Sequence, residues 1–254
     1  MKVISANVNG LGAATKYGFF DWLVWQNPDI ACLQELNVSA LPESFLTWAG
    51  RANFEVAISP CLGQDNGGVA ILSRHGFLDI QTAGGSLQHR GQIVRAKIGD
   101  LHVSSVYVTL DNLEEERKAL HEIFRDMLTH PDDLSLVCGD FNIIGTDRDA
   151  DTKYHSKSLG CKPEERAWLA MLLSEWVDVL PSCTQEKRLR TFWVRSKERF
   201  EANLGTRIDY QLASSALAKL AIKDSGSVFR DYWHGVRITD HGPITVEYDI
   251  NILA

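Results

Sequence analysis

The chain has 254 residues, of which 44% are hydrophobic and 23% charged, and its formal net charge is −7. This composition is typical of a soluble globular protein, and the acidic total argues against nonspecific coating of nucleic acid. No apolar run approaches the ~20 residues of a membrane-spanning helix, and no signal-peptide core follows Met1. We therefore expect a cytoplasmic protein with no membrane partner. No linker rich in proline, glycine or serine divides the chain, so we expect one domain spanning residues 1–254.

The cysteines are scattered and form no C-x-x-C pair. This spacing predicts reduced, mostly buried thiols rather than a disulfide framework or a zinc site. A local basic surface is still compatible with the acidic total. Between residues 185 and 199, six cations outnumber two carboxylates. That segment fits a solvated loop and a contact to a phosphate backbone equally well.

The first elements follow the order strand, helix, strand. Residues 3–8 alternate apolar with small or polar side chains and end in Asn9-Gly10, which predicts a strand and a turn. Apolar residues recur at helical spacing over residues 16–26, and Asn27-Pro28 ends that pattern. Residues 29–35 read as a short buried strand that finishes on a carboxylate.

The middle of the chain is richer in predicted strands. They are separated by turns containing glycine or aspartate, and they cover residues 54–60, 67–73, 93–98, 101–110 and 134–138. Gly99-Asp100 predicts a tight hairpin between two of them. A helix is expected over residues 113–128, with three glutamates in its first turn, where the helix dipole favours negative charge.

The last third begins with a polar stretch, residues 145–162, which predicts a functional or poorly ordered loop. Proline in the first turn opens a helix over residues 163–177. The remaining predicted elements are strands over residues 191–194, 207–212 and 244–248 and a helix over residues 214–221. Runs of strands with single helices between them indicate two facing sheets with helices outside.

The segment 136–143 is the strongest single candidate for chemistry. An apolar run leads to Gly139 and then to Asp140 and Asn142, which point the same way if the backbone is extended, while Phe141 turns into the core. Such a pair suits a phosphate or a metal-bound water. A simple Gly-Asp turn explains the segment equally well when it is taken alone.

Several predicted strands end on polar residues that a packed core does not favour. Each one singly fits a turn, a strand end or core filling. Together they can converge on one rim of a sheet sandwich and supply oxygen ligands for a hard cation, a base for water and donors for a phosphate. They are Asn7, Glu35, Tyr107, Asp140, Asn142, Asp209, Asp240 and His241.

The sequence resembles the exonuclease III and abasic-site endonuclease branch of the endonuclease/exonuclease/phosphatase superfamily. Seven ordered blocks carry the resemblance nearly from end to end: residues 7–10, 33–35, 68–71, 139–142, 163–168, 207–210 and 240–243. The resemblance implies an α/β (α+β) fold of the DNase I type. This fold is a four-layer sandwich in which two central mixed β-sheets are flanked by helices.

The resemblance also implies roles for these residues. Glu35 matches the principal Mg²⁺ ligand, with Asn7 and Asp240 beside it, and Mn²⁺ is expected to substitute. Asp140 matches the residue that orients or deprotonates the attacking water. His241, paired with Asp209, would contact the scissile phosphate as an imidazolium. The phosphate oxygens would be held by Asn142 and Tyr107. Further substrate contacts are expected from Asn9, Arg207 and Trp193.

Two departures from the family pattern concern the substrate. Abasic-site enzymes of this branch usually carry tryptophan where Thr206 stands, and that ring helps to wall the pocket for a flipped-out sugar. The proline that typically follows Tyr107 is also missing. Other aromatic residues could replace the ring or simply fill the core: Trp193, Phe229, Tyr232 and Trp233.

The sequence therefore predicts a monomeric, Mg²⁺-dependent phosphodiesterase that acts on double-stranded DNA in DNA repair, as an abasic-site endonuclease, a 3′–5′ exonuclease or both. Two alternatives stay open. The same site could act on RNA, a nucleotide conjugate or a phospholipid head group. The fold could also serve a nonenzymatic nucleic-acid-binding regulator. Retention of the carboxylate, amide and imidazole set argues against the regulator, because a binding scaffold does not need it.

Overall fold

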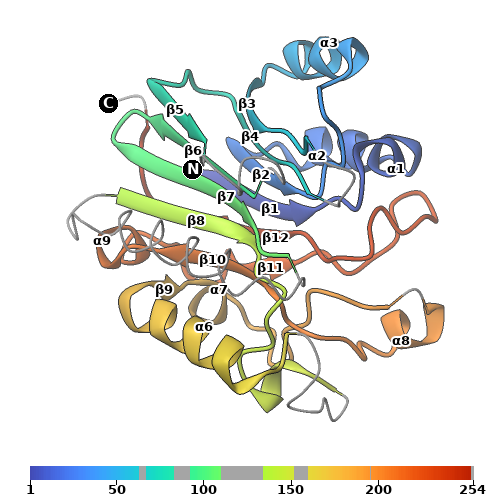
Figure 1. Cartoon of the computed structure of the whole chain (residues 1–254), viewed down its shortest axis with the longest axis vertical. Helices are drawn as coiled ribbons and strands as arrows, with labels where there is room; N and C mark the ends of the chain where they lie inside the picture. Colours follow the sequence, from blue (N-terminus) through green and yellow to red (C-terminus); the bar gives the residue numbers. More distant parts are fainter. Residues whose placement is uncertain (63–66, 83–91, 110–133, 152–159, 195, 253–254) are drawn as a thin grey trace.

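Two six-stranded sheets form the centre of the protein in a computed structural model of the chain (Figure 1). The structure describes residues 1–62, 67–82, 92–109, 134–151, 160–194 and 196–252. The helix expected over residues 113–128 and part of the polar stretch 145–162 lie outside these residues. Within the described part of the chain, no helix is both long enough and apolar enough to cross a membrane.

The first sheet is built mainly from the N-terminal half and closed by the C-terminal strands. In spatial order it contains β11 (Ser227–Val228), β12 (Ile244–Glu247), β1 (Lys2–Asn7), β2 (Ile30–Gln34), β4 (Val69–Ser73) and β3 (Glu55–Ser59). β1 and β2 are parallel, whereas β12 pairs with β1 in the antiparallel direction. The carboxyl ends of β1 and β2 therefore lie side by side.

The second sheet comes mainly from the middle of the chain. Its order is β5 (Asp79–Thr82), β6 (Ile93–Ile98), β7 (Leu101–Tyr107), β8 (Leu134–Asp140), β10 (Asp209–Ala213) and β9 (Val177–Asp178). β6 and β7 form the hairpin predicted at Gly99-Asp100. β7 and β8 are parallel and β10 runs against β8, so the start of β10 meets the ends of β7 and β8.

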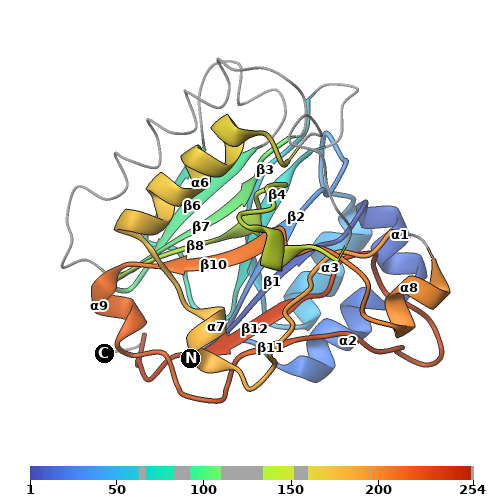
Figure 2. The ribbon, with the colours of Figure 1, turned by 90° about the horizontal axis from the view of Figure 1, so that it is seen from below.

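Helices cover the outer faces of both sheets, as Figure 2 shows from below. Apolar residues of β1 and β2 pack outward against α1 (Leu11–Lys16), α2 (Phe19–Gln26) and α3 (Glu43–Arg51). The second sheet packs against α6 (Pro163–Glu175). A third apolar cluster fills the space between the sheets. Four short elements complete the described set: η1 (Asp147–Asp149), α7 (Leu180–Cys183), α8 (Lys197–Glu201) and α9 (Ser215–Ala218).

This arrangement confirms the predicted four-layer sandwich, with differences in detail. The helix expected over residues 16–26 begins only at Phe19, as α2, because Gly18 adopts left-handed backbone with φ 77°, and α1 precedes it. Residues 191–194 form isolated bridges through Phe192 and no strand, so that prediction was wrong. The sequence patterns did not reveal α3 or β5, whose four residues are all exposed.

The cysteines agree with the expectation for reduced thiols. All five are free and buried: Cys32, Cys61, Cys138, Cys161 and Cys183. Cys32 and Cys138 lie in the cluster between the sheets. Their small, apolar side chains fill the interior of the sandwich.

Candidate active site

The ends of strands from both sheets meet at one rim of the sandwich. Asn7 ends β1 and Glu35 follows β2, while Tyr107 and Asp140 end β7 and β8. The register places Asp140 beside Tyr107 on one side and beside Asp209 of β10 on the other. The segment before β12 adds Asp240 and His241 to this rim. The predicted convergence of strand-end residues is thus present in the fold.

The amide of Asn7 connects the two sheets at this rim. Its Nδ2 atom donates to Glu35 Oε1 and to Asp140 Oδ2, each at 2.9 Å. Asn7 and Asp140 are completely buried. The Oδ1 atom of Asn7 accepts the backbone N–H of Asn9 at 3.0 Å. Two carboxylates from different sheets are therefore held around one nitrogen atom.

His241 and Asp209 form a buried pair next to Asp140. His241 Nδ1 lies 2.9 Å from Asp209 Oδ2, and its Nε2 lies 3.9 Å from Asp140 Oδ2. Burial opposes the positive charge, but the carboxylates of Asp209, Asp140 and Asp240 outweigh it and raise the pKa of His241 to about 10. The imidazole is therefore a cation at neutral pH and offers an Nε2–H donor.

Asp140 is poised for proton exchange. Burial is the main cause that raises its pKa, to about 8, and the negative charge of Asp209 adds to it. His241 and the Asn7 amide act in the opposite direction. A carboxyl group with a pKa close to neutral pH is suited to accept a proton from water, because its two protonation states are both accessible.

Glu35 stands on strained backbone at the end of β2. Its φ is 53°, a left-handed conformation that glutamate rarely adopts. The backbone carbonyl of Glu35 accepts the N–H of Gly10 at 2.7 Å, which ties the two strand ends together. Tyr107 lies next to this carboxylate. The pKa of its phenol is raised well above the ordinary value, mainly by burial and further by the negative charges of Glu35 and Asp140. Strain of this kind often marks a functional position.

The expectation that Asp140 and Asn142 share extended backbone was wrong. Asn142 has a φ of 52°, and its backbone N–H donates to Asp140 Oδ1 at 2.8 Å. The chain thus turns immediately after β8. The Asn142 amide donates to the carbonyl of Val108 at 2.8 Å, while Phe141 is buried as predicted. The turn fixes the orientation of the Asp140 carboxylate, which an extended strand end would leave free to rotate.

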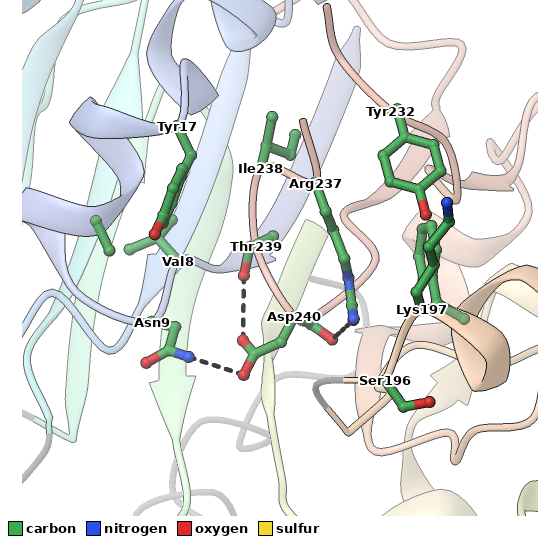
Figure 3. A pocket seen from close by; sticks show the side chains of 12 residues that line it. Val8, Asn9, Tyr17, Ser196, Lys197, Tyr232, Arg237, Ile238, Thr239 and Asp240 are labelled. Atoms are coloured by element: carbon green, nitrogen blue, oxygen red, sulfur yellow. Dashed lines mark hydrogen bonds between the residues drawn. The ribbon is translucent and has the colours of Figure 1, made fainter. Parts of the chain in front are cut away.

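Asn9 and Asp240 form the other side of the rim, shown in Figure 3. Asn9 Nδ2 donates to Asp240 Oδ2 at 2.8 Å. Thr239 accepts the backbone N–H of His241 and donates to the Asn7 carbonyl at 2.8 Å. This threonine therefore couples the segment before β12 to the end of β1.

Two of the residues expected to contact substrate lie elsewhere. Trp193 is completely buried against Phe200, and its indole donates to Asn203 Oδ1 at 3.2 Å. Arg207 is 8% exposed and pairs with Asp178 and Asp149. Both side chains have internal partners in this structure, and their expected substrate contacts stay predictions.

Sequence reasoning missed three residues that support the site. Thr239 has the role described above. The hydroxyl of Thr191 accepts the backbone N–H groups of Ile208 and Asp209, each at 3.1 Å, and so fixes the start of β10. Phe192 lies with its ring centroid 4.9 Å from that of His241. The isolated threonines give no sequence signal. Phe192 does give one, because an aromatic residue inside the basic segment 185–199 is a candidate for a substrate contact.

Thr206, where the family usually has tryptophan, is buried and pairs with Phe192 and Ala150 through backbone bridges. Phe192 also packs near Ile208 in a small apolar cluster. The rings of Phe229, Tyr232 and Trp233 do not fill this position, because they pack around Trp22, Phe200 and Trp25, respectively. The wall beside His241 is thus formed by Phe192.

The donor set fits a hard divalent cation. Asp140, Asp209 and His241 offer ligand atoms within 4.8 Å of one another. A protonated His241 has no lone pair for a metal, however, so carboxylate oxygens are the better ligands. Glu35, whose carboxylate accepts the Asn7 amide, and Asp240 on the adjacent side meet that requirement. The accumulation of buried negative charge here favours a bound cation.

A two-sheet sandwich with carboxylates, amides and a charged His–Asp pair at one rim defines a hydrolase of phosphate esters. The model of the Endonuclease/Exonuclease/phosphatase family matches residues 4–241. The DNA repair nuclease APEX1 of Danio rerio is 30% identical over 239 residues, which cover 85% of this chain and 74% of that protein. The chain belongs to the Endonuclease/Exonuclease/phosphatase family, in its exonuclease III and abasic-site endonuclease branch.

Two solved structures agree with this assignment. A 3′–5′ exonuclease, NExo, from Neisseria meningitidis is 28% identical, with a TM-score of 0.82 over 98% of this chain and 100% of that one. The 3′ phosphatase NExo from Neisseria bound to a product DNA hairpin is 27% identical, with a TM-score of 0.83 and the same coverage. The expected family and the expected hydrolase class are thereby confirmed.

Proposed function

We propose that this protein is a Mg²⁺-dependent phosphodiesterase that cleaves DNA, as an abasic-site endonuclease, a 3′–5′ exonuclease or both. The observation that carries the proposal is the double hydrogen bond from Asn7 to Glu35 and Asp140 beside the His241–Asp209 pair. It brings an acid–base carboxylate, cation ligands and a positively charged donor to one place. The similarity to nucleases that act on DNA supports the choice of substrate.

Asp140 accepts a proton from the attacking water. Its carboxylate is held by the Asn7 amide and by the backbone N–H of Asn142, so one oxygen atom can be aimed at the water. The raised pKa makes it a stronger base than an ordinary aspartate. The water oxygen adds to phosphorus as its proton passes to Asp140, and the bond to the 3′-oxygen breaks. The departing 3′-oxygen takes up a proton from solvent, so the products carry a 5′-phosphate and a 3′-hydroxyl.

His241 stabilises the negative charge that develops on the phosphate oxygens. Its Nε2–H is the donor, and Asp209 keeps the ring charged and oriented through Nδ1. Tyr107 and Asn142 bind phosphate oxygens from the adjacent side. Asn9 orients Asp240 and lies close enough to the rim to contact substrate.

Glu35, Asn7 and Asp240 would hold the cation, with Mg²⁺ preferred and Mn²⁺ able to substitute. The cation would neutralise nonbridging oxygens and stabilise the departing 3′-oxygen. These side chains supply oxygen ligands without sulfur or neutral imidazole, as hard cations require. Glu35 stands on left-handed backbone, and its carboxylate accepts the Asn7 amide at the rim where the cation would be held.

Duplex DNA bound by a monomer is the proposed form of the complex. A second substrate class, RNA, is favoured by one observation, the buried Thr206 in place of the family tryptophan. Without that ring, the wall beside His241 is less specific for a flipped-out abasic sugar.

The purified chain should be assayed with Mg²⁺ on a duplex with a tetrahydrofuran abasic analogue, a recessed 3′ end and single-stranded RNA. Incision beside the analogue supports endonuclease activity, and digestion from the 3′ end supports exonuclease activity. His241→Ala should lower kcat by about two orders of magnitude or more. His75→Ala, a histidine paired with Asp29 away from the rim, is the matched control. Equal turnover by both variants would overturn the proposed site.

A further inference from the structure

A cavity of about 360 Å³ opens beside the proposed active site. It lies between the end of α1, the start of α8 and residues 237–240, and Figure 3 shows Tyr17 and Tyr232 on its opposite sides. Asn9 and Asp240 belong both to the wall of this cavity and to the rim described above. The size falls within the ~300–1,000 Å³ of small-molecule binding sites.

The walls of the cavity are aromatic and partly open to solvent. Tyr17 is 42% exposed and Tyr232 is 36% exposed. The ring of Tyr232 rests edge-on against Phe200 at 5.6 Å, and its hydroxyl donates to Glu201 at 3.3 Å. Ile238 closes the floor and is buried. The supported ring of Tyr232 and the exposed ring of Tyr17 therefore border an accessible space.

The segment that carries Tyr232 is anchored from behind. The Cζ atom of Arg237 lies 4.4 Å from the ring centroid of Phe200, and its guanidinium donates to the carbonyls of Trp193 and Asp240. Trp233 packs on Trp25 with ring centroids 5.2 Å apart and lies against Gly18. The cavity thus has a preformed shape, which reduces the entropy lost when a ligand binds.

The polar groups of the cavity suit a nucleotide. Asn9 supplies an amide, and Lys197 places a cation at the rim, where its side chain is 71% exposed and 3.8 Å from Glu201. Aromatic rings bind bases of every sequence, because each base has a π-face.

We infer that this cavity binds the base of an unpaired nucleotide next to the scissile phosphate, on the Asp240 side. A base inside a duplex is stacked on its neighbours and cannot enter. The cavity therefore favours single-stranded segments or frayed ends over continuous duplex, and Lys197 contacts the neighbouring phosphate. This inference rests on the proposed function, since it assumes that a phosphodiester occupies the rim.

The test uses a single-stranded octanucleotide with one 2-aminopurine, and the same strand in a duplex, titrated with the full chain in EDTA. Stacking should quench the single-stranded probe. Tyr17→Ala and Tyr232→Ala should each weaken its binding at least about fivefold, whereas Tyr17→Phe and Tyr232→Phe retain the ring and the binding. Leu46→Ala, an exposed apolar residue on α3, is the control. Melting curves establish that every variant is folded.

Hydrolysis in Mg²⁺ separates the two proposals. The alanine variants should raise KM for the single strand and leave KM for duplex unchanged. If the parent chain cleaves DNA but the alanine variants bind and cleave the single strand as it does, the inference is overturned and the proposed function stands. If no substrate is cleaved but quenching depends on both rings, the base site stands and the proposed function fails.

Discussion

His241 Nδ1 lies 2.9 Å from Asp209 Oδ2, and both side chains are buried. Asp209 is held by the register of β10 against β8, and Thr191 fixes its backbone N–H. His241 is held by Thr239. The pair is thus oriented from two separate segments, and the Nε2 atom of His241 is left to face Asp140 and the substrate.

Asp209→Asn should lower kcat about 100-fold or more near pH 8. The amide keeps the shape of the side chain but removes the negative charge that keeps His241 protonated, so the imidazole loses its Nε2–H donor as the pH rises. The loss should be smaller near pH 6. The measurement is kcat against pH for both proteins, with Asp231→Asn as an exposed control. A parallel reduction at every pH would contradict the charge-based role.

The stability of the metal-free protein should fall as the pH rises. The pKa of His241 is about 10 in the folded protein and ~6.5 in the unfolded chain. Its contribution to the free energy of unfolding is therefore complete below pH ~6.5 and is lost as the pH rises toward 10. The pKa of Asp140 is about 8 in the folded protein and ~3.9 in the unfolded chain, so the folded state keeps this proton to higher pH. At both residues the folded state binds more protons than the unfolded state, so both lower the stability as the pH rises.

Urea midpoints in EDTA at pH 6, 7.5 and 9 measure this dependence. His241→Asn should flatten the change between pH 7.5 and 9. Saturating Mg²⁺ should raise the midpoint most at high pH, because loss of the Asp140 proton adds a negative charge beside the proposed cation site. A midpoint that increases with pH in EDTA would reverse the sign and refute this account.

The position of the site was predictable because it depends on topology. Parallel strands of one sheet place their carboxyl ends at one edge, so Asn7 could be grouped with Glu35, and Tyr107 with Asp140, from the order of the elements. The role of Asp209 required the family resemblance, since only the antiparallel register of β10 brings its first residue to the same edge.

The orientation of individual side chains was not predictable in the same way. Glu35 and Asn142 adopt left-handed backbone, which depends on tertiary hydrogen bonds that local patterns do not encode. Arg207 precedes β10, so strand alternation does not give its direction. Trp193 is buried because α8 brings Phe200 against it, and the sequence patterns did not reveal that helix.

Glu35→Gln should weaken cation binding and leave the fold intact. The amide oxygen can still accept the hydrogen bond from Asn7, but one ligand charge is removed. In EDTA the variant should be at least as stable as the parent, because like charges are buried nearby. The rise in Tm with increasing Mg²⁺ should shift to about tenfold higher concentration or more. Glu43→Gln on α3 is the control, and identical Mg²⁺ titrations would exclude Glu35 as a ligand.

Gly139→Ala should destabilise the protein and reduce activity, although it lies in the strand interior before Asp140. A Cβ atom at Gly139 would lie 2.1 Å from the Val106 carbonyl oxygen, so β7 and β8 would have to separate. Overpacking of this kind costs about 1–3 kcal/mol. The displacement would also move Asp140 from Asn7 and His241, so kcat should fall in the fraction that remains folded.

Gly50→Ala provides the matched control for this substitution. Gly50 lies in α3, and no atom lies within 4 Å of a Cβ built there. The same added methyl group should therefore stabilise the protein, by about 0.5–1 kcal/mol, because alanine loses less backbone entropy in a helix. Urea unfolding measures both variants. The urea midpoint is expected to fall in Gly139→Ala and to rise in Gly50→Ala. An unchanged midpoint in Gly139→Ala would show that β7 and β8 can separate without loss of stability.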